Sequence, residues 1–215
     1  MNQMDEDVPA DILSEAAIKL ERFNFFGRTP SDDKLNALFR KIAHTEDMKL
    51  KELWTDNMDK DVPADIFAEA AVKLERVSFF GRTPSDEQLT ALFRKIVDTD
   101  ALKLKEFCVS VEKPKAFQYD EEVDVFCEAA VRLEVLDIPI SSDLADCLLR
   151  KIVETEDMKL KTVHSVDTTS VQADTLIEAA LKVNIHYSEG GRQSLSGEYS
   201  RDLFRKGSVK SAISR

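Results

Sequence analysis

Three cysteines and three histidines carry the chemistry that proteins most often use for catalysis and metal binding. Their spacing argues against both uses, because the number of cysteines is odd, no Cys-x-x-Cys pair occurs and the histidines lie far apart in the chain. We therefore expect structural, reduced thiols, as in a cytosolic protein, and no metal site. The residues concerned are Cys108, Cys127, Cys147, His44, His164 and His186.

Two loops of identical sequence, Gly-Arg-Thr-Pro-Ser, stand before segments that we expect to be helical. Gly27–Ser31 and Gly81–Ser85 could place a phosphate at a helix N-terminus, but they lack the glycine spacing and the lysine of a nucleotide-binding loop. We interpret them as turns. The acidic pairs Glu46-Asp47 and Glu156-Asp157 recur at one point of a repeat, which indicates solvated helix ends. We expect no catalytic residues, no cofactor and no enzymatic activity.

The composition argues against several classes of partner. The 215 residues carry a net charge of −11, and 43% of them are hydrophobic. A nucleic-acid binder needs a basic stripe to neutralise phosphates, so we expect no nucleic-acid partner and no anionic membrane surface. Met1–Asp7 is acidic and polar, unlike a signal peptide, and no apolar run approaches the roughly 18 residues of a membrane span. These features predict a soluble, cytoplasmic protein.

The chain repeats itself. Val8–Asp61 aligns with Val62–Lys115 without a gap, and about 32 of these 54 pairs are identical. A third copy begins near Asp124, and a fourth begins at Ala173 and fades after Tyr187. Self-similarity at a fixed period is the signature of a repeat architecture, in which neighbouring units bury each other's apolar faces.

Each long period contains two short leucine-containing strings, which we interpret as strands. Successive strings lie about 23 to 30 residues apart, the length of one strand plus one helix in a leucine-rich repeat. In the third string, alternation directs Leu74, Val77 and Phe79 inward, and Arg76 and Ser78 to the opposite side. The strings are Lys19–Phe23, Lys49–Leu53, Lys73–Val77, Lys103–Phe107, Arg132–Leu136, Lys159–Val163 and, more weakly, Lys182–Ile185.

The segments between the strings predict helices. Ser85 and Gln88 have the spacing of a capping box. Leu89, Leu92 and Phe93 then follow at i, i+3 and i+4, which places them on one apolar helix face. Alternating strands and helices of this length stack their strands into a parallel sheet that is covered by helices on one face.

These residues resemble leucine-rich repeats of the ribonuclease-inhibitor type, and repeats of intracellular innate-immune receptor relatives, over roughly Val8 to Ile185. The resemblance implies a horseshoe with a concave sheet and a convex helical face. The chain departs from the family after each strand, where the family places an Asn or Cys that satisfies backbone groups in the bend. Since an unsatisfied buried group costs about 1–3 kcal/mol, we expect looser turns. The corresponding residues here are Arg28, Met58, Arg82, Glu112, Ser141 and Thr168.

We therefore expect an α/β fold, a right-handed leucine-rich-repeat solenoid with a parallel sheet on the concave face and helices on the convex face. An all-helical solenoid is the alternative. Residues 1–187 would form the solenoid, in about seven half-repeats, and residues 188–215, rich in Ser, Gly and Arg, a polar and flexible tail. Because no capping unit is evident, we expect either a fragment of a longer chain or self-association through the uncapped ends.

A binding site on this fold would use the outward-facing side chains of the strands. Arg22, Glu52, Arg76 and Glu106 would alternate in sign on strands about 4.8 Å apart, as mutually satisfied ion pairs or as a charged rail for a partner. Trp54 is either an aromatic anchor for that partner or packed against Lys51 and the neighbouring strands. The candidate protein-binding residues are Arg22, Asn24, Glu52, Trp54, Arg76, Ser78, Glu106, Cys108, Asp137 and His164.

The function that these features favour is a protein–protein interaction module that binds a protein partner on the concave repeat face. The resemblance alone suggests that the module is part of an intracellular receptor or regulator. The family resembled also includes GTPase activators, so a GTPase-regulating repeat protein is one alternative. A degenerate structural repeat protein without a dedicated partner is another, because the turn residues of the family are missing.

Overall fold

The computed structural model describes residues 8–25, 31–55, 61–81, 84–109 and 120–187. Helices and strands alternate strictly along these ranges. The helices are α1 (Ala10–Ala17), α2 (Asp32–His44), α3 (Ala64–Val72), α4 (Asp86–Asp98), α5 (Asp120–Ala130), α6 (Ser142–Glu154) and α7 (Ala173–Lys182). The strands are β1 (Arg22–Asn24), β2 (Glu52–Thr55), β3 (Arg76–Phe79), β4 (Glu106–Val109), β5 (Val135–Ile140), β6 (Thr162–Val166) and β7 (Asn184–Tyr187).

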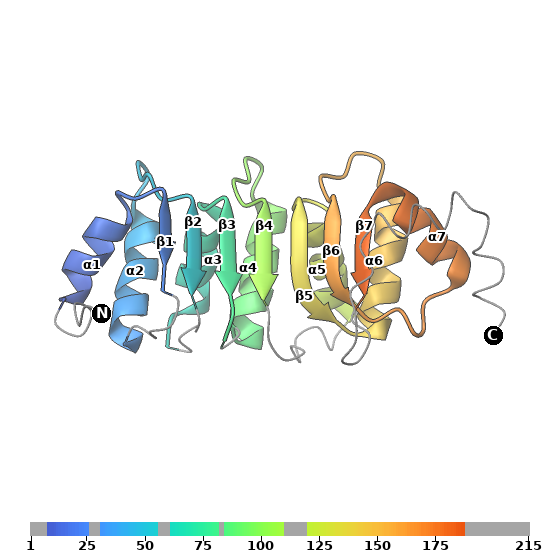
Figure 1. Ribbon diagram of the computed structural model, residues 1–215, viewed down its shortest axis with the longest axis horizontal. Helices are drawn as coiled ribbons and strands as arrows, with labels where there is room; N and C mark the ends of the chain where they lie inside the picture. The colour runs from blue at the N-terminus through green and yellow to red at the C-terminus, as the bar shows by residue number, and fades with distance from the viewer. Residues whose placement is uncertain (1–7, 26–30, 56–60, 82–83, 110–119, 188–215) are drawn as a thin grey trace.

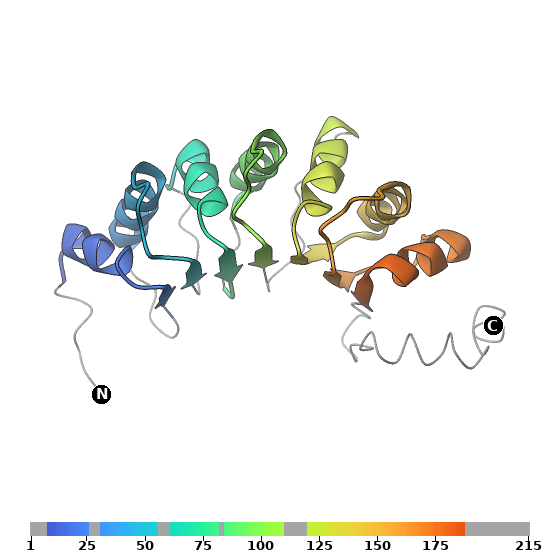
Figure 2. The same ribbon diagram turned by 90° about the horizontal axis from the view of Figure 1, so that it is seen from above.

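The seven strands form one parallel sheet in chain order, from β1 to β7. Figure 1 shows them side by side, and Figure 2 shows the helices on one side of the sheet, in a shallow arc with the sheet on its inner side. We call the surface of the sheet opposite the helices the open face. The predicted α/β class with a parallel sheet is confirmed, and the all-helical alternative is wrong.

The anchor leucines of the repeated strings lie just before the strands, in the core between sheet and helices. Leu50, Leu74 and Leu104 are at most 2% exposed, and each of their strands begins two residues later. Leu20, the anchor before β1, is 48% exposed because no described strand precedes β1 to cover it. The core therefore consists of layers that neighbouring half-repeats bury for one another, as expected for a solenoid.

A chain of buried phenylalanines connects helices and strands across the middle of the core. Aromatic pairs of this kind, with ring centroids about 4.5–7 Å apart, contribute beyond their buried area. The contacts and centroid distances are Phe39–Phe67 at 5.6 Å, Phe67–Phe79 at 5.9 Å, Phe79–Phe107 at 6.3 Å, Phe107–Phe93 at 5.9 Å and Phe93–Phe126 at 5.1 Å.

Two kinds of helix alternate along the sheet. Helices α1, α3, α5 and α7 carry the sequence Glu-Ala-Ala, and we call them Glu-Ala-Ala helices. Helices α2, α4 and α6 have 13 residues each and carry Arg-Lys after two apolar residues, and we call them Arg-Lys helices. The motifs are Glu15–Ala17, Glu69–Ala71, Glu128–Ala130 and Glu178–Ala180 in the first kind, and Leu38–Lys41, Leu92–Lys95 and Leu148–Lys151 in the second.

A cation at the end of three Glu-Ala-Ala helices reaches back to the Arg-Lys helix before it. The Lys73 ammonium donates to the carbonyl of Ala43 at 2.5 Å, and the Arg132 guanidinium donates to that of Ile96 at 2.6 Å. Lys182 donates to three carbonyls at the end of α6, at 2.6 to 3.2 Å. Helix carboxyl ends leave carbonyls without intrahelical partners and attract cations, so these side chains cross-link successive half-repeats.

The predicted capping box at α4 is confirmed. The Ser85 hydroxyl accepts a hydrogen bond from the Gln88 amide at 3.2 Å, and the Gln88 side chain accepts one from the Ser85 amide at 2.8 Å. Buried Gln88 also donates to the carbonyl of Val62 at 2.7 Å, ahead of α3. In α2 the equivalent Ser31 makes no side-chain cap, and residue 34 is a lysine. The first two repeats thus differ in the contacts at the start of this helix, where Gln88 links Ser85 to Val62 in the second repeat and a lysine takes the place of Gln88 in the first.

Several sequence predictions fall outside the described residues. The tail at 188–215 is one of them, and so are most residues of the two Gly-Arg-Thr-Pro-Ser loops. Of the six turn positions that lack the Asn or Cys of the family, Ser141 and Thr168 lie within the described ranges. Ser141 stands at the N-cap of α6 and forms no side-chain cap hydrogen bond.

Candidate functional site

The register of the sheet places the predicted binding residues in two rows on adjacent strands. One row pairs Arg22 with Glu52, Glu52 with Arg76 and Arg76 with Glu106. The second row lies two residues further along the strands and contains Asn24, Trp54, Ser78, Cys108, Asp137 and His164. The sequence therefore predicted which residues are neighbours across six strands.

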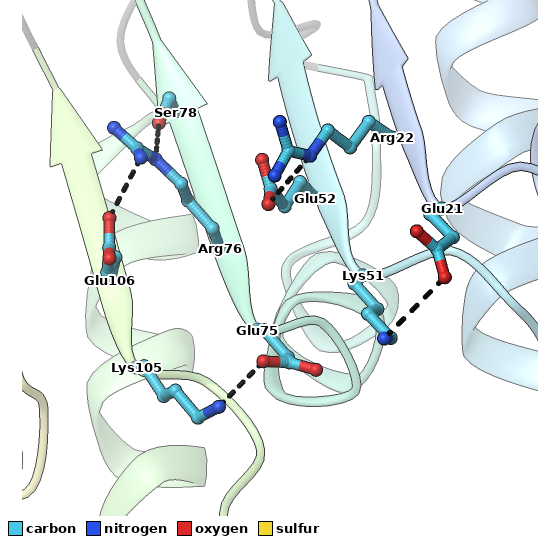
Figure 3. Close-up of polar contacts among 9 residues, drawn as sticks. All are labelled: Glu21, Arg22, Lys51, Glu52, Glu75, Arg76, Ser78, Lys105 and Glu106. Carbon is cyan, nitrogen blue, oxygen red and sulfur yellow. Dashed lines mark hydrogen bonds and ion pairs between the residues drawn. The ribbon is translucent and has the colours of Figure 1, made fainter.

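The first row consists of two separate ion pairs. The Arg22 Nε lies 3.0 Å from Glu52 Oε1, and the Arg76 Nη1 lies 3.0 Å from Glu106 Oε2 (Figure 3). The Arg22 side chain is 77% exposed, whereas that of Arg76 is 33% exposed. Exposed pairs of this kind contribute about 0–1 kcal/mol. These charges therefore satisfy one another in pairs, as one of the two interpretations of the sequence expected.

A further charged row, which the sequence analysis did not predict, runs one residue before the first, and we call it the preceding row. Glu75 Oε2 lies 2.6 Å from Lys105 Nζ, and Glu21 Oε1 lies 3.8 Å from Lys51 Nζ (Figure 3). Glu134 pairs with Lys161 at the corresponding positions. Its signs alternate in the opposite phase to those of the first row. The signal was present in the repeated strings, where Glu-Arg and Lys-Glu follow the anchor leucine in turn.

Hydrogen bonding within the preceding row changes the pKa values of three of its members, Glu75, Lys105 and Glu134. The ammonium of Lys105 donates to Glu75, which lowers the pKa of that carboxyl and raises the pKa of Lys105. The hydrogen bond from Lys161 likewise lowers the pKa of Glu134. The charges of Glu75, Lys105 and Glu134 are therefore held in their ionised forms by their neighbours. Although the chain has a net charge of −11, this part of the open face presents balanced charges of both signs.

Trp54 lies on β2, the second of the seven strands, and is half-buried. The guanidinium carbon of Arg76 is 4.5 Å from the centre of the indole ring, within the range of a cation–π contact. The ring of Phe80 lies 6.0 Å away, and Phe80 is 38% exposed. The indole thus packs against the neighbouring strand, as one of the two interpretations expected, and keeps part of its surface accessible.

Two of the ten predicted residues are not accessible, which corrects the expectation that the whole column faces outward to a partner. Ser78 is 0% exposed and Cys108 is 7% exposed. Ser78 accepts a hydrogen bond from Arg76 Nε at 3.4 Å, and burial raises the pKa of the Cys108 thiol. Short side chains that stand between long ones on a strand are covered by the long ones. Ser78 and Cys108 therefore pack within the protein and are not available to a partner. The remaining eight are exposed or half-buried.

Two histidines that are distant in the sequence are stacked at the C-terminal end of the open face. The rings of His164 and His186 lie 4.2 Å apart at an angle of 12°. Burial, followed by the nearby His164, lowers the pKa of His186. Asp137, opposite His164 in the register, accepts a hydrogen bond from the Ser165 hydroxyl at 3.1 Å. No group of three metal-binding side chains occurs in the described part of the chain.

The cysteines lie away from one another, apart from one pair. Cys127 in α5 is buried, and its pKa is raised by burial and then by the neighbouring thiol of Cys147 in α6. Cys147 is half-buried. A buried thiol with a raised pKa is a poor nucleophile.

Comparisons with known proteins found no relative of this chain. No family model, curated protein or solved structure matches the chain. The resemblance to leucine-rich repeats therefore depends on the residues and the sheet alone. In the residues that the structure describes, no helix has the length and apolar character needed to cross a membrane.

Proposed function

We propose that the chain is a leucine-rich-repeat solenoid of the ribonuclease-inhibitor-like type, curved into part of a horseshoe, whose open face binds a protein partner in the cytoplasm. The observation that carries this proposal is the half-buried indole of Trp54, stacked on Arg76 and flanked by the exposed ring of Phe80. Tryptophan and arginine dominate the energetics of protein interfaces when charged and polar residues surround them.

The charges around Trp54 favour a polypeptide as the ligand. The two charged rows alternate in sign from strand to strand, so they complement a surface that presents both signs at intervals of about 4.8 Å. Nucleic acid presents one sign only. Alternating rows also disfavour partners whose charges fall out of register, since like charges then face each other.

The test is affinity measurement with matched variants. Partners captured by the full-length chain from cytosol would be purified, and their dissociation constants would be measured by calorimetry. Trp54→Ala is expected to weaken binding by about tenfold or more. Arg94→Ala is the control, since Arg94 is exposed on helix α4, on the other side of the sheet. A partner whose affinity is equal for both variants and the parent chain would contradict the proposal.

A further inference from the structure

Helix α7, the last one in the described residues, exposes a side chain that its counterparts bury. Leu181 of α7 follows the Glu-Ala-Ala motif, as Ile18, Val72 and Val131 do in the three other helices of this kind. These three residues are 8%, 5% and 4% exposed, whereas Leu181 is 73% exposed. An Arg-Lys helix and the loop after it follow each of the helices α1, α3 and α5 and cover this position there.

Two contacts recur where an Arg-Lys helix packs on a Glu-Ala-Ala helix. The first is an ion pair between the helices: Lys95 Nζ lies 2.6 Å from Glu69, Lys151 Nζ lies 2.5 Å from Glu128, and Lys41 pairs with Glu15 in the same way. The second joins the loop after the Arg-Lys helix to the position equivalent to Leu181. There, the amide of Lys49 donates to the carbonyl of Ile18 and that of Lys159 to the carbonyl of Val131, both at 2.9 Å.

Helix α7 has the residues for such a neighbour. Glu178 occupies the position of Glu15, Glu69 and Glu128, is exposed, and forms no ion pair with any described residue. The residues that follow β7 supply the complementary motif. Leu203-Phe204-Arg205-Lys206 is identical to the motif of α2 and α4, and Ser196 stands seven residues before Leu203, as the N-cap residues Ser31 and Ser85 stand before theirs.

The distance along the chain fits this assignment. The motif leucine follows the open-face residue of the preceding strand by 14 positions from Asn24 to Leu38, and by 11 positions from Asp137 to Leu148. Leu203 follows His186 by 17 positions. Loops between strand and helix thus already vary by three residues within this chain, and a further three residues lengthen a surface loop at little cost in free energy.

The segment also departs from its counterparts. Ser200 and Gly207 stand where the Arg-Lys helices hold buried leucine and isoleucine, for example Leu35 and Ile42. Contacts of this helix would therefore depend on Leu203 and Phe204, with Arg201, Asp202 and Arg205 supplying a polar outer surface. A terminal unit with a polar outer face is what ends a solenoid without exposing its core.

We propose that residues 196–206 form an eighth, Arg-Lys half-repeat of the same chain, which docks on α7, covers Leu181 and pairs Lys206 with Glu178. This assignment replaces the expectation of a flexible tail for part of residues 188–215, and it does not depend on the proposed protein-binding function. The occupant is the chain's own segment, selected by the charge complementarity and by the exposed leucine.

The experiment uses the full-length chain in a Cys147→Ser background with Glu178→Cys and Lys206→Cys. Mild oxidation is expected to join these two cysteines within one chain, and Asp174→Cys with Lys206→Cys is the control, because Asp174 lies one turn earlier on α7. Equal cross-linking of the control pair, or a cross-link that joins two chains, would overturn the proposal.

Hydrogen exchange of the unmodified chain provides an independent measurement, which does not rely on the cysteine variants. Amides of residues 200–206 are expected to exchange at least about tenfold more slowly than in an unstructured peptide, and Phe204→Asp is expected to remove this protection. Exchange of residues 200–206 at the rate of an unstructured peptide would overturn the docking, whatever the outcome of the cross-linking.

Discussion

The guanidinium of Arg76 lies 4.5 Å from the centre of the Trp54 ring, while its Nη1 lies 3.0 Å from the carboxylate of Glu106. One side chain therefore connects β2, β3 and β4. Arg22 occupies the equivalent position on β1 and pairs with Glu52 at the same distance, but no aromatic contact accompanies that ion pair in the described structure. The two arginines form a natural comparison.

Arg76→Ala is expected to destabilise the chain by about 1 kcal/mol, because it removes a cation–π contact and a partly buried ion pair. Arg22→Ala should cost less than about 0.5 kcal/mol, since its pair is largely exposed. Urea unfolding followed by the fluorescence of Trp54 measures both values. The emission of Arg76→Ala should also shift to longer wavelength as the indole gains water. Equal effects of the two substitutions would show that the aromatic contact contributes nothing.

Ser85→Ala is expected to lower the free energy of unfolding by about 1 kcal/mol, the usual contribution of an N-cap side chain. The hydroxyl accepts a hydrogen bond from Gln88 there, whereas the Ser31 hydroxyl caps nothing in the otherwise similar first repeat. Ser31→Ala should therefore change stability by a few tenths of a kcal/mol at most. Denaturant titration of the two variants decides the point, and a larger loss for Ser31→Ala would refute it.

Stability is expected to fall on acidification because of His186. Its pKa in the folded chain lies below the ordinary value of 6.5, so the unfolded chain binds more protons at pH values just under 6.5. The free energy of unfolding should therefore rise with pH up to about 6.5. The contribution of His186 is present above that pH and is lost as the pH falls through its folded pKa. His186→Gln should remove this part of the slope in urea titrations between pH 5 and 7.5.

His164→Gln serves as the graded control for that measurement. The imidazole of His164 is the second cause of the lowered pKa of His186, after burial. Its replacement by a neutral side chain should shrink the slope without abolishing it. A slope that is identical in all three proteins would show that the stacked pair plays no part in the pH dependence.

Cys147 is expected to react with iodoacetamide before the two other cysteines. Alkylation requires an accessible thiolate, whereas Cys108 and Cys127 are buried and burial raises the pKa of both. Peptide mass spectrometry at short reaction times should find Cys147 modified at least about tenfold more than either. In urea the three should react alike. Rapid labelling of Cys127 in the folded chain would mean that α5 and α6 separate readily.

The sequence predicted the strands and their neighbours because the repeat supplies its own alignment. Once Leu50, Leu74 and Leu104 are recognised as equivalent, the parallel sheet follows in chain order, and so does the pairing of Glu52 with Arg76. Strand alternation then gives the side of the sheet. These steps use spacing alone, which a sequence contains in full.

What the sequence did not predict depends on the size of neighbours and on local backbone changes. Ser78 faces the same side as Arg76 but is covered by it. The stacking of His164 on His186 follows a register shift in β6, where Ser165 has a φ of 62°. A non-glycine residue in this left-handed region is uncommon, and no pattern of apolar residues signals it.

The cations at the ends of α3, α5 and α7 give the array a property that stacked layers alone lack. Lys73, Arg132 and Lys182 each connect a helix to the carboxyl end of the previous one. The ion pairs of Lys41, Lys95 and Lys151 connect the helices at the alternate joints. A force applied along the arc would be passed from helix to helix through both sets of contacts, so that bending at one joint strains the next. Such a protein would respond to tension as an elastic rod rather than as a row of independent hinges.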